Sequence, residues 1–279
     1  MGEPFTGSKA VAAGRLTPYQ LRSRYVAVYP GVHVSRGTEL TARSKAKAAW
    51  LWSGGRGVIA GRSASALHGA KWLDARRPAE LIYGNRYSPK GIRIWSDSVK
   101  DDDVELVSGM RVTTPARTAL DLACRYPVGE AVALIDALAN ATGLKMADVE
   151  ALVDRHRGRR GIKNARRVLD LVDPGAESPR ETWLRLLVIR AGFPRSRTQI
   201  PVYDEFGLLV GVFDMGWDDV QVAADYEGDQ HRTDRFRFNR DIRKAETVTR
   251  LGWTDIRVTA IDGEADIIKR IAAAGVQRA

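Results

Sequence analysis

The sequence is poor in cysteine and in long apolar runs. Its 279 residues include one cysteine, Cys124, so neither an internal disulfide nor a cysteine metal cluster is expected. No apolar stretch reaches the ~18 residues that a membrane-spanning helix needs. Residues 1–5 also lack the basic and apolar blocks of a secretory signal. We therefore expect a cytoplasmic protein without a membrane partner.

Acidic residues are scarce in the first third of the chain. Residues 1–95 hold 16 Lys and Arg against 4 Asp and Glu, a balance of +12, whereas the remainder holds 28 against 30. Such a localised basic field suits a phosphate backbone, because each neutralised phosphate releases counterions. Arginine outnumbers lysine by 34 to 10, and its guanidinium makes bidentate contacts with phosphate and guanine. The alternative is a solvated surface that promotes solubility.

Residues 5–34 predict two short helices followed by a hairpin. Residues 5–13 favour a helix, and Thr17-Pro18 begins a second one, with threonine as N-cap and proline at the first helical position. Tyr25–Tyr29 and Val32–Val34 are strand-like and are joined by a Pro-Gly turn. This is the layout of a winged helix, in which the second helix meets the DNA major groove. The alternative is an amphipathic helix pair that packs on the rest of the protein.

This first stretch resembles the N-terminal domain of AbiEi-type antitoxin and regulator proteins, over roughly residues 5–70. The matching motifs are Phe5-Thr6, Ala12-Ala13-Gly14, Leu16-Thr17, Gln20-Leu21, Tyr29-Pro30-Gly31-Val32 and Ser63-Ala64-Ser65-Ala66-Leu67-His68-Gly69. The resemblance implies that the second helix contacts DNA. The residues that would then face DNA are Tyr19, Gln20, Arg22, Ser23 and Arg24.

The middle of the chain mixes short strands with helices. Strands are predicted over residues 80–83, 92–95 and 104–107, and helices over 115–123, 129–141, 146–155 and 162–171. A basic loop at residues 155–160 is a second candidate phosphate contact, although solvated arginines are the commoner explanation. Asp173-Pro174-Gly175 favours a turn and marks a domain boundary.

We therefore predict an α+β (mixed α/β) chain of three domains: a winged helix over residues 1–75, a mixed middle domain over 76–173, and a third domain over 174–279.

In the last third, carboxylates accumulate on apolar strands. Leu208–Asp214 and Val220–Glu227 read as a hairpin that turns near Asp218-Asp219. With a two-residue turn, Asp214 lies opposite Ala223, and Asp225 is its diagonal neighbour on the same face. Glu227 follows Asp225 by two residues and shares that face. Clustered carboxylates repel one another unless a cation lies between them, and oxygen ligands suit Mg²⁺ or Mn²⁺.

Residues 177–262 resemble the PD-(D/E)XK nuclease superfamily, and most closely its branch related to very-short-patch-repair (Vsr-like) endonucleases. The motifs are Ser178-Pro179-Arg180-Glu181, Gln199-Ile200-Pro201-Val202, Phe213-Asp214, Asp225-Tyr226-Glu227-Gly228-Asp229-Gln230-His231, Asn239-Arg240-Asp241-Ile242-Arg243 and Leu251-Gly252-Trp253 before Ile256-Arg257-Val258. The resemblance implies a restriction-endonuclease-like domain with the order α-β-β-β-α-β.

The same resemblance implies a role for each site residue. Asp214 and Asp225 would hold the metal, with Glu181 contributing directly or through water, and the metal would activate a water molecule. Gln199 would orient water or phosphate, and His231 is a candidate base or phosphate contact. The cations expected to approach the DNA backbone are Arg240, Arg243 and Lys244.

Two positions depart from the superfamily pattern. Asp225 stands where this branch usually has glutamate, and Glu227 stands where the wider superfamily has lysine, although an acidic residue there is usual in this branch. Without that lysine, the group that activates water is unassigned.

The leading hypothesis is a Mg²⁺-dependent deoxyribonuclease that acts on double-stranded DNA, associated with the nucleoid and with a homodimer as one candidate assembly. The alternative is a transcriptional regulator or antitoxin-like protein that binds DNA without cutting it. A third, RNA-processing, hypothesis uses the same metal chemistry.

Overall fold

The computed structural model describes residues 2–85, 87–227 and 246–278. The chain divides into two compact units, residues 1–170 and 171–279, and each is described by itself. The three-domain division expected from the sequence stays a prediction.

The first unit begins with two short helices and a small sheet. The elements are β1 (Phe5–Thr6), α1 (Gly7–Ala12), α2 (Pro18–Arg24), β2 (Tyr25–Tyr29) and β3 (Val32–Ser35). The sheet has the order β1-β3-β2, and both pairings are antiparallel. Gly31, at φ 77°, adopts the left-handed conformation that the tight turn between β2 and β3 requires. The predicted sequence of two helices and a hairpin is therefore present.

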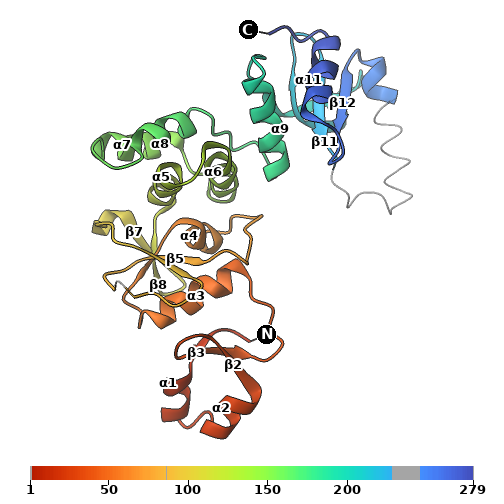
Figure 1. The fold of residues 1–279 in the computed structure, drawn as a ribbon. Coiled ribbons are helices and arrows are strands. Elements are labelled where there is room, and N and C mark those ends of the chain that lie inside the picture. Colours follow the sequence, from red (N-terminus) through yellow and green to blue (C-terminus); the bar gives the residue numbers. More distant parts are fainter. Residues whose placement is uncertain (1, 86, 228–245, 279) are drawn as a thin grey trace. The chain divides into compact units, whose positions relative to one another are not determined.

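In the described residues of this unit, a five-stranded sheet, six α-helices and a 3-10 helix (Asp101–Asp103) follow. The elements are α3 (Ala42–Trp52), β4 (Val58–Ile59), α4 (Gly61–Leu67), β5 (Ala79–Ile82), β6 (Ile92–Trp95), β7 (Val104–Val107), β8 (Met110–Thr113), α5 (Pro115–Arg125), α6 (Val128–Thr142), α7 (Met146–Arg155) and α8 (Ile162–Leu169). The sheet has the order β6-β5-β4-β8-β7. Helices α5 to α8 lie on the opposite side of this sheet from α1 and α2 (Figure 1).

The N-terminal hairpin and the five-stranded sheet share one apolar core. Tyr29 and Val32 of the hairpin pack in the same cluster as Ala46 of α3, Ile59 of β4 and Leu81 of β5. The Tyr29 hydroxyl also donates to the Gly91 carbonyl oxygen at 3.1 Å. Burial raises the pKa of Tyr29 to about 12, so this hydroxyl remains a donor at neutral pH. Shared burial of this kind anchors the small hairpin, which could not bury enough apolar surface by itself.

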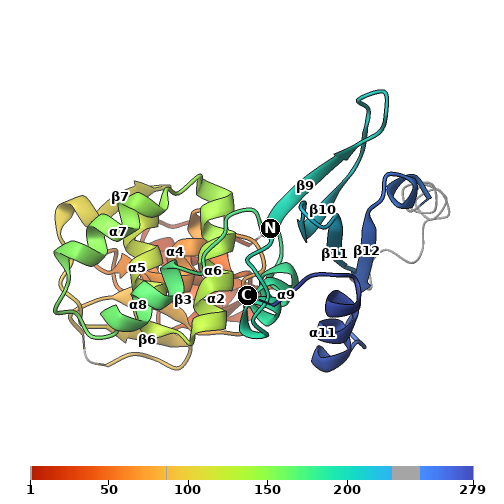
Figure 2. The same ribbon diagram turned by 90° about the horizontal axis from the view of Figure 1, so that it is seen from above.

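The second unit is a mixed four-stranded sheet with helices. The elements are α9 (Pro179–Arg190), β9 (Arg197–Tyr203), β10 (Leu209–Trp217), β11 (Val222–Tyr226), β12 (Thr254–Val258) and α11 (Glu264–Ala273); residues 246–250 are also helical. The sheet has the order β12-β11-β10-β9, and β11 pairs with β12 in parallel. Strands β9 and β10 form a long hairpin (Figure 2). The α+β class predicted from the sequence is confirmed.

The predicted two-residue turn between β10 and β11 is wrong. Strand β10 continues to Trp217, which pairs with Val222, so four residues, 218–221, make the turn. The register places Gly216, not Asp214, opposite Ala223. Among the described residues, no helix is both long enough and apolar enough to cross a membrane.

Candidate functional site

Helix α2 is secured at both ends although none of its residues is buried. At the N-terminus, the Thr17 hydroxyl accepts from the Gln20 backbone N–H at 3.1 Å, and the Gln20 side-chain oxygen accepts from the Thr17 N–H at 2.9 Å. This capping box satisfies two backbone donors that the helix leaves open. At the C-terminus, the Arg36 guanidinium donates to the carbonyl oxygens of Arg22 and Ser23, both at 2.9 Å. These contacts keep a seven-residue helix folded without a buried face.

The outer surface of α2 carries four of the five predicted DNA-facing side chains. Tyr19 is 74% exposed, and Arg22, Ser23 and Arg24 are exposed. Gln20 is half-buried, and its side-chain oxygen accepts a hydrogen bond in the capping box. It therefore positions the helix, whereas the other four side chains point to solvent.

Unpaired cations surround this surface. Lys9 on α1, Arg15 before α2, and Arg22 and Arg24 on α2 are all exposed. Within the described part of the chain, their side chains have no ion-pair or hydrogen-bond partner. Cations without an internal partner keep their full charge available to an external anion. Lys9 and Arg15 were missed by the sequence analysis, which considered only the second helix.

The basic loop at residues 155–160 has a different environment. Arg159 forms ion pairs with Asp97, at 3.0 Å, and with Asp121, and Arg155 pairs with Asp102 at 2.9 Å. Arg155 and Arg159 thus already have carboxylate partners in the same unit, whereas Arg160 is exposed and has none among the described residues, so one cation of this loop is left for phosphate contact.

The two carboxylates central to the predicted metal site are tied to the backbone. One oxygen of Asp225 accepts from the Asp214 N–H, and one oxygen of Asp214 accepts from the Tyr226 N–H, both at 2.8 Å. The two residues thus lie across from each other, Asp214 within β10 and Asp225 near the end of β11. Their side chains replace part of the hydrogen-bond ladder between these strands.

The strand pleat is irregular at this point. Phe213 packs in one apolar cluster and Met215 in another, although residues two apart on a regular strand share a face. On β9, Gln199 lies next to Ile200, the partner of Phe213, and has a φ of 50°. A left-handed conformation is uncommon for a residue other than glycine and marks local strain. Gln199 and Asp214 therefore adjoin a distorted segment of the sheet.

Glu181 and Glu227 are engaged elsewhere. Glu181 accepts from the Glu177 N–H at 2.7 Å, at the start of α9, where Ser178 is the N-cap. Burial raises the pKa of the Glu181 carboxyl, although the hydrogen bonds from Glu177 and Ser178 oppose this shift. Glu227 pairs with Arg257 at 2.9 Å. The predicted residues His231, Arg240, Arg243 and Lys244 lie outside the described residues.

One oxygen of each predicted metal ligand is already engaged. Asp214, Asp225 and Glu181 each accept a backbone N–H through one oxygen, so a metal ion would have to bind the second oxygen of each carboxylate. In the ranges that the structure describes, no group of three or more histidine, cysteine or carboxylate side chains is arranged to hold a metal ion.

A buried carboxylate that the sequence analysis missed lies in the first unit. Glu80 is 2% exposed, and it accepts from the Arg62 N–H at 2.8 Å and from the Tyr126 hydroxyl. Burial raises the pKa of Glu80, and these two hydrogen bonds and the nearby cations Arg93 and Arg62 oppose the shift. Gly61 leaves room for this carboxylate, because a Cβ there would overlap its oxygen. Glu80 therefore acts as an internal cap of α4.

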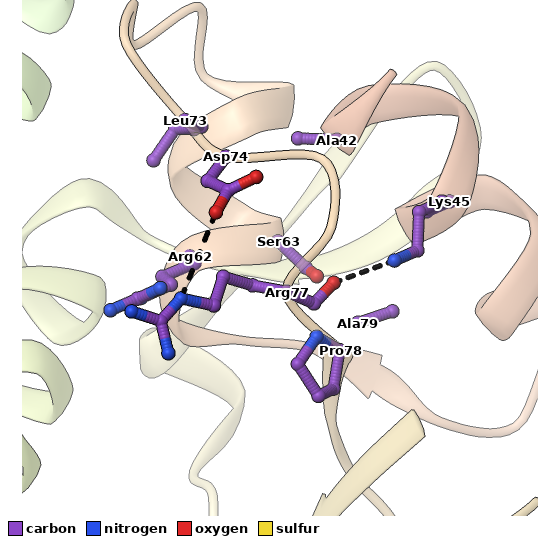
Figure 3. A pocket seen from close by; sticks show the side chains of 9 residues that line it. All are labelled: Ala42, Lys45, Arg62, Ser63, Leu73, Asp74, Arg77, Pro78 and Ala79. Carbon is purple, nitrogen blue, oxygen red and sulfur yellow. Dashed lines mark hydrogen bonds and ion pairs between the residues drawn. The ribbon is translucent and has the colours of Figure 1, made fainter. Parts of the chain in front are cut away.

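A shallow pocket beside α4 has its cations already engaged. Its lining residues are Ala42, Lys45, Arg62, Ser63, Leu73, Asp74, Arg77, Pro78 and Ala79 (Figure 3). Lys45 donates to the carbonyl oxygens of Ala75 and Arg77 at 2.7 and 2.6 Å. Asp74 forms an ion pair with Arg77 at 3.9 Å. The pocket thus holds a loop in place and leaves little charge for a ligand.

Comparison with known proteins found one matching family model and two similar mycobacterial proteins. Residues 59–171 match the model of the AbiEi antitoxin C-terminal domain. The uncharacterized protein Rv2248 of Mycobacterium tuberculosis (strain ATCC 25618 / H37Rv) is 30% identical over 237 residues, which cover 85% of this chain and 86% of the relative. The uncharacterized protein MT2308 of strain CDC 1551 / Oshkosh matches equally. The chain belongs to one family with these mycobacterial proteins, and its middle part is AbiEi-like.

The AbiEi-like part shares a core with the hairpin that follows α2. It begins at Ile59, in β4, a residue that packs in the same core as the N-terminal hairpin. The hairpin that packs against α2 is thus joined to the AbiEi-like part by a common core. The nuclease resemblance falls on residues 177–262, beyond the matched range, and stays a prediction.

Proposed function

We propose that this chain is an AbiEi-like DNA-binding regulator or antitoxin, which binds duplex DNA through its N-terminal helices and hairpin without cutting it. The observation that carries the proposal is the set of unpaired, exposed cations on and beside α2. It is supported by the AbiEi antitoxin match that follows directly in the same compact unit.

The dimensions and chemistry of α2 suit the major groove. A helix with its side chains is about 10–12 Å across, which fits a groove about 12 Å wide. Arg22 and Arg24 offer bidentate donors, and exposed Tyr19 offers a ring and a hydroxyl. Because Thr17 and Arg36 hold both helix ends, the side chains are presented on a preorganised element, which lowers the entropic cost of binding.

The carboxylates of the second unit favour binding without cleavage. Cleavage by a metal needs carboxylate oxygens directed at the ion, whereas one oxygen of Asp214 and one of Asp225 are hydrogen-bonded to backbone N–H groups of the facing strand. We therefore favour the regulator over the metal-dependent deoxyribonuclease.

The test compares two charge-matched double variants of the full chain. Arg22→Ala/Arg24→Ala removes two unpaired cations from α2, and the control Lys163→Ala/Arg167→Ala removes two exposed, unpaired cations from α8. Binding to a labelled duplex is measured by fluorescence anisotropy, with Mg²⁺ and with EDTA. We expect the first variant to bind weakly, the control to bind like the wild type, and EDTA to have little effect. Equal loss in both variants would contradict the proposed surface.

Incubation with supercoiled plasmid tests the rest of the proposal. The wild type should leave the plasmid intact with Mg²⁺ or Mn²⁺. Nicking that requires the metal and disappears in Asp225→Asn would restore the nuclease hypothesis.

A further inference from the structure

One face of the second unit's sheet concentrates charge around a single guanidinium. Ala224 of β11 and Ile256 of β12 pack in the core with α9 and α11, whereas Ala223, on the other face of β11, is buried in a second apolar cluster. The charged residues of these two strands and of the position that follows β11 therefore share the other face. They are Asp225, Glu227, Asp255 and Arg257.

Arg257 is arranged to neutralise all three carboxylates. Its Nη1 lies 2.9 Å from Oε1 of Glu227, and its Nε lies 3.1 Å from Oδ2 of Asp255. The parallel register places it level with Asp225 on the neighbouring strand. Burial lowers the pKa of Arg257, but the hydrogen bond and charge of Asp255, with the charges of Glu227 and Asp225, raise it above its usual range.

The backbone beneath Arg257 is held in place as well. Its carbonyl oxygen accepts from Arg270 on α11 at 2.8 Å. Arg270 is in turn paired with Asp262 at 2.9 Å and with Asp266 at 3.1 Å. The guanidinium thus projects from a fixed strand end, which distinguishes it from an isolated surface ion pair between two mobile side chains.

We propose that Arg257 is the built-in cation of this carboxylate face, and that its presence excludes a divalent metal from the same carboxylates. A protein side chain then does permanently what the clustered carboxylates were expected to require of Mg²⁺ or Mn²⁺: it offsets the repulsion between neighbouring carboxylates. The proposal concerns the second unit only and is independent of DNA binding by α2.

The experiment removes the guanidinium and asks whether a metal ion takes its place. Arg257→Met keeps much of the aliphatic stem and loses the charge. The matched control is Arg250→Met, which breaks one exposed ion pair of the same unit, with Glu205 at 3.7 Å. For each full-length protein, Mn²⁺ binding is followed by electron paramagnetic resonance, and the melting temperature is measured with and without Mn²⁺.

We expect Arg257→Met to melt below the wild type and to recover part of the difference when Mn²⁺ is added. Its Mn²⁺ affinity should exceed that of the wild type by about tenfold or more, because a unit positive charge some 5 Å from a divalent ion repels it strongly even in water. The wild type and Arg250→Met should respond little to Mn²⁺. Arg257→Lys keeps the charge and should behave like the wild type.

Two results would overturn the proposal. One is tight Mn²⁺ binding by the wild type that Asp225→Asn abolishes, which can be measured even where Arg257→Met fails to fold. The other is a folded Arg257→Met protein that Mn²⁺ neither binds nor stabilises. DNA binding by α2, measured on the same samples, separates failure of this proposal from failure of the proposed function.

Discussion

Loss of Arg22 and Arg24 should change the salt dependence of DNA binding by a calculable amount. If the four unpaired cations Lys9, Arg15, Arg22 and Arg24 each neutralise one phosphate, affinity falls with salt on a log–log slope of about −3.6. Between ~50 and ~200 mM salt, affinity then drops roughly 150-fold. The double alanine variant keeps two cations, so its slope should be about −1.8 and its drop roughly 12-fold.

The same relation predicts the loss of affinity itself. With the electrostatic gain taken as zero near ~1 M salt, two lost phosphate contacts weaken binding about 60-fold at ~0.1 M. Fluorescence anisotropy at four or more salt concentrations gives the slope for the wild type, for Arg22→Ala/Arg24→Ala and for the control Lys163→Ala/Arg167→Ala. A wild-type slope shallower than about −2, or one that the α2 variant leaves unchanged, would refute the assignment of phosphate contacts to these cations.

Three further predictions concern the first unit. Arg36→Ala removes two hydrogen bonds from the end of α2. Amide hydrogen exchange over residues 18–24 should therefore accelerate about fivefold to tenfold, which corresponds to ~1 kcal/mol. Unchanged exchange would show that Arg36 does not stabilise this helix end. Arg117, 1% exposed, pairs with Asp103 at 2.6 Å and Asp121 at 3.1 Å. Because Arg117→Met leaves these two buried carboxylates without their cation, it should lower the free energy of unfolding, measured in urea, by about 3 kcal/mol. A loss below ~1 kcal/mol would show that these ion pairs do not stabilise the fold. Burial raises the pKa of Glu80 above its ordinary 4.5, so the folded protein keeps a proton that the unfolded chain loses. The stability that this proton contributes is complete below pH 4.5 and is lost as pH rises through the raised pKa. Glu80→Gln should flatten this fall in stability above pH 4.5, and an unchanged pH profile would disprove the shift.

Local signals in the sequence were sufficient for several elements. The Thr17-Pro18 start of α2, the Pro-Gly turn before β3 and the strand over residues 92–95 agree with the structure, because caps, turns and strand patterns depend on near neighbours. Helix α3 and strands β4 and β8 were not predicted. Strand β4 has only two residues, and its pairing with β5 and β8 comes from segments far along the chain.

The candidate site shows the same difference between what local sequence predicts and what depends on distant segments. Sequence placed Tyr19, Arg22 and Arg24 on an exposed helix, and it identified the carboxylates of the second unit as a group. Only the tertiary structure decided which charges were already engaged: Arg159 with Asp121 across 38 residues, and Arg257 with Glu227 across 30. A four-residue turn in place of two changed which residue faces Asp214. Side-chain type and helix capping are local properties, whereas register and ion pairing depend on how distant strands are brought together, and for this reason the sequence by itself could not assign them.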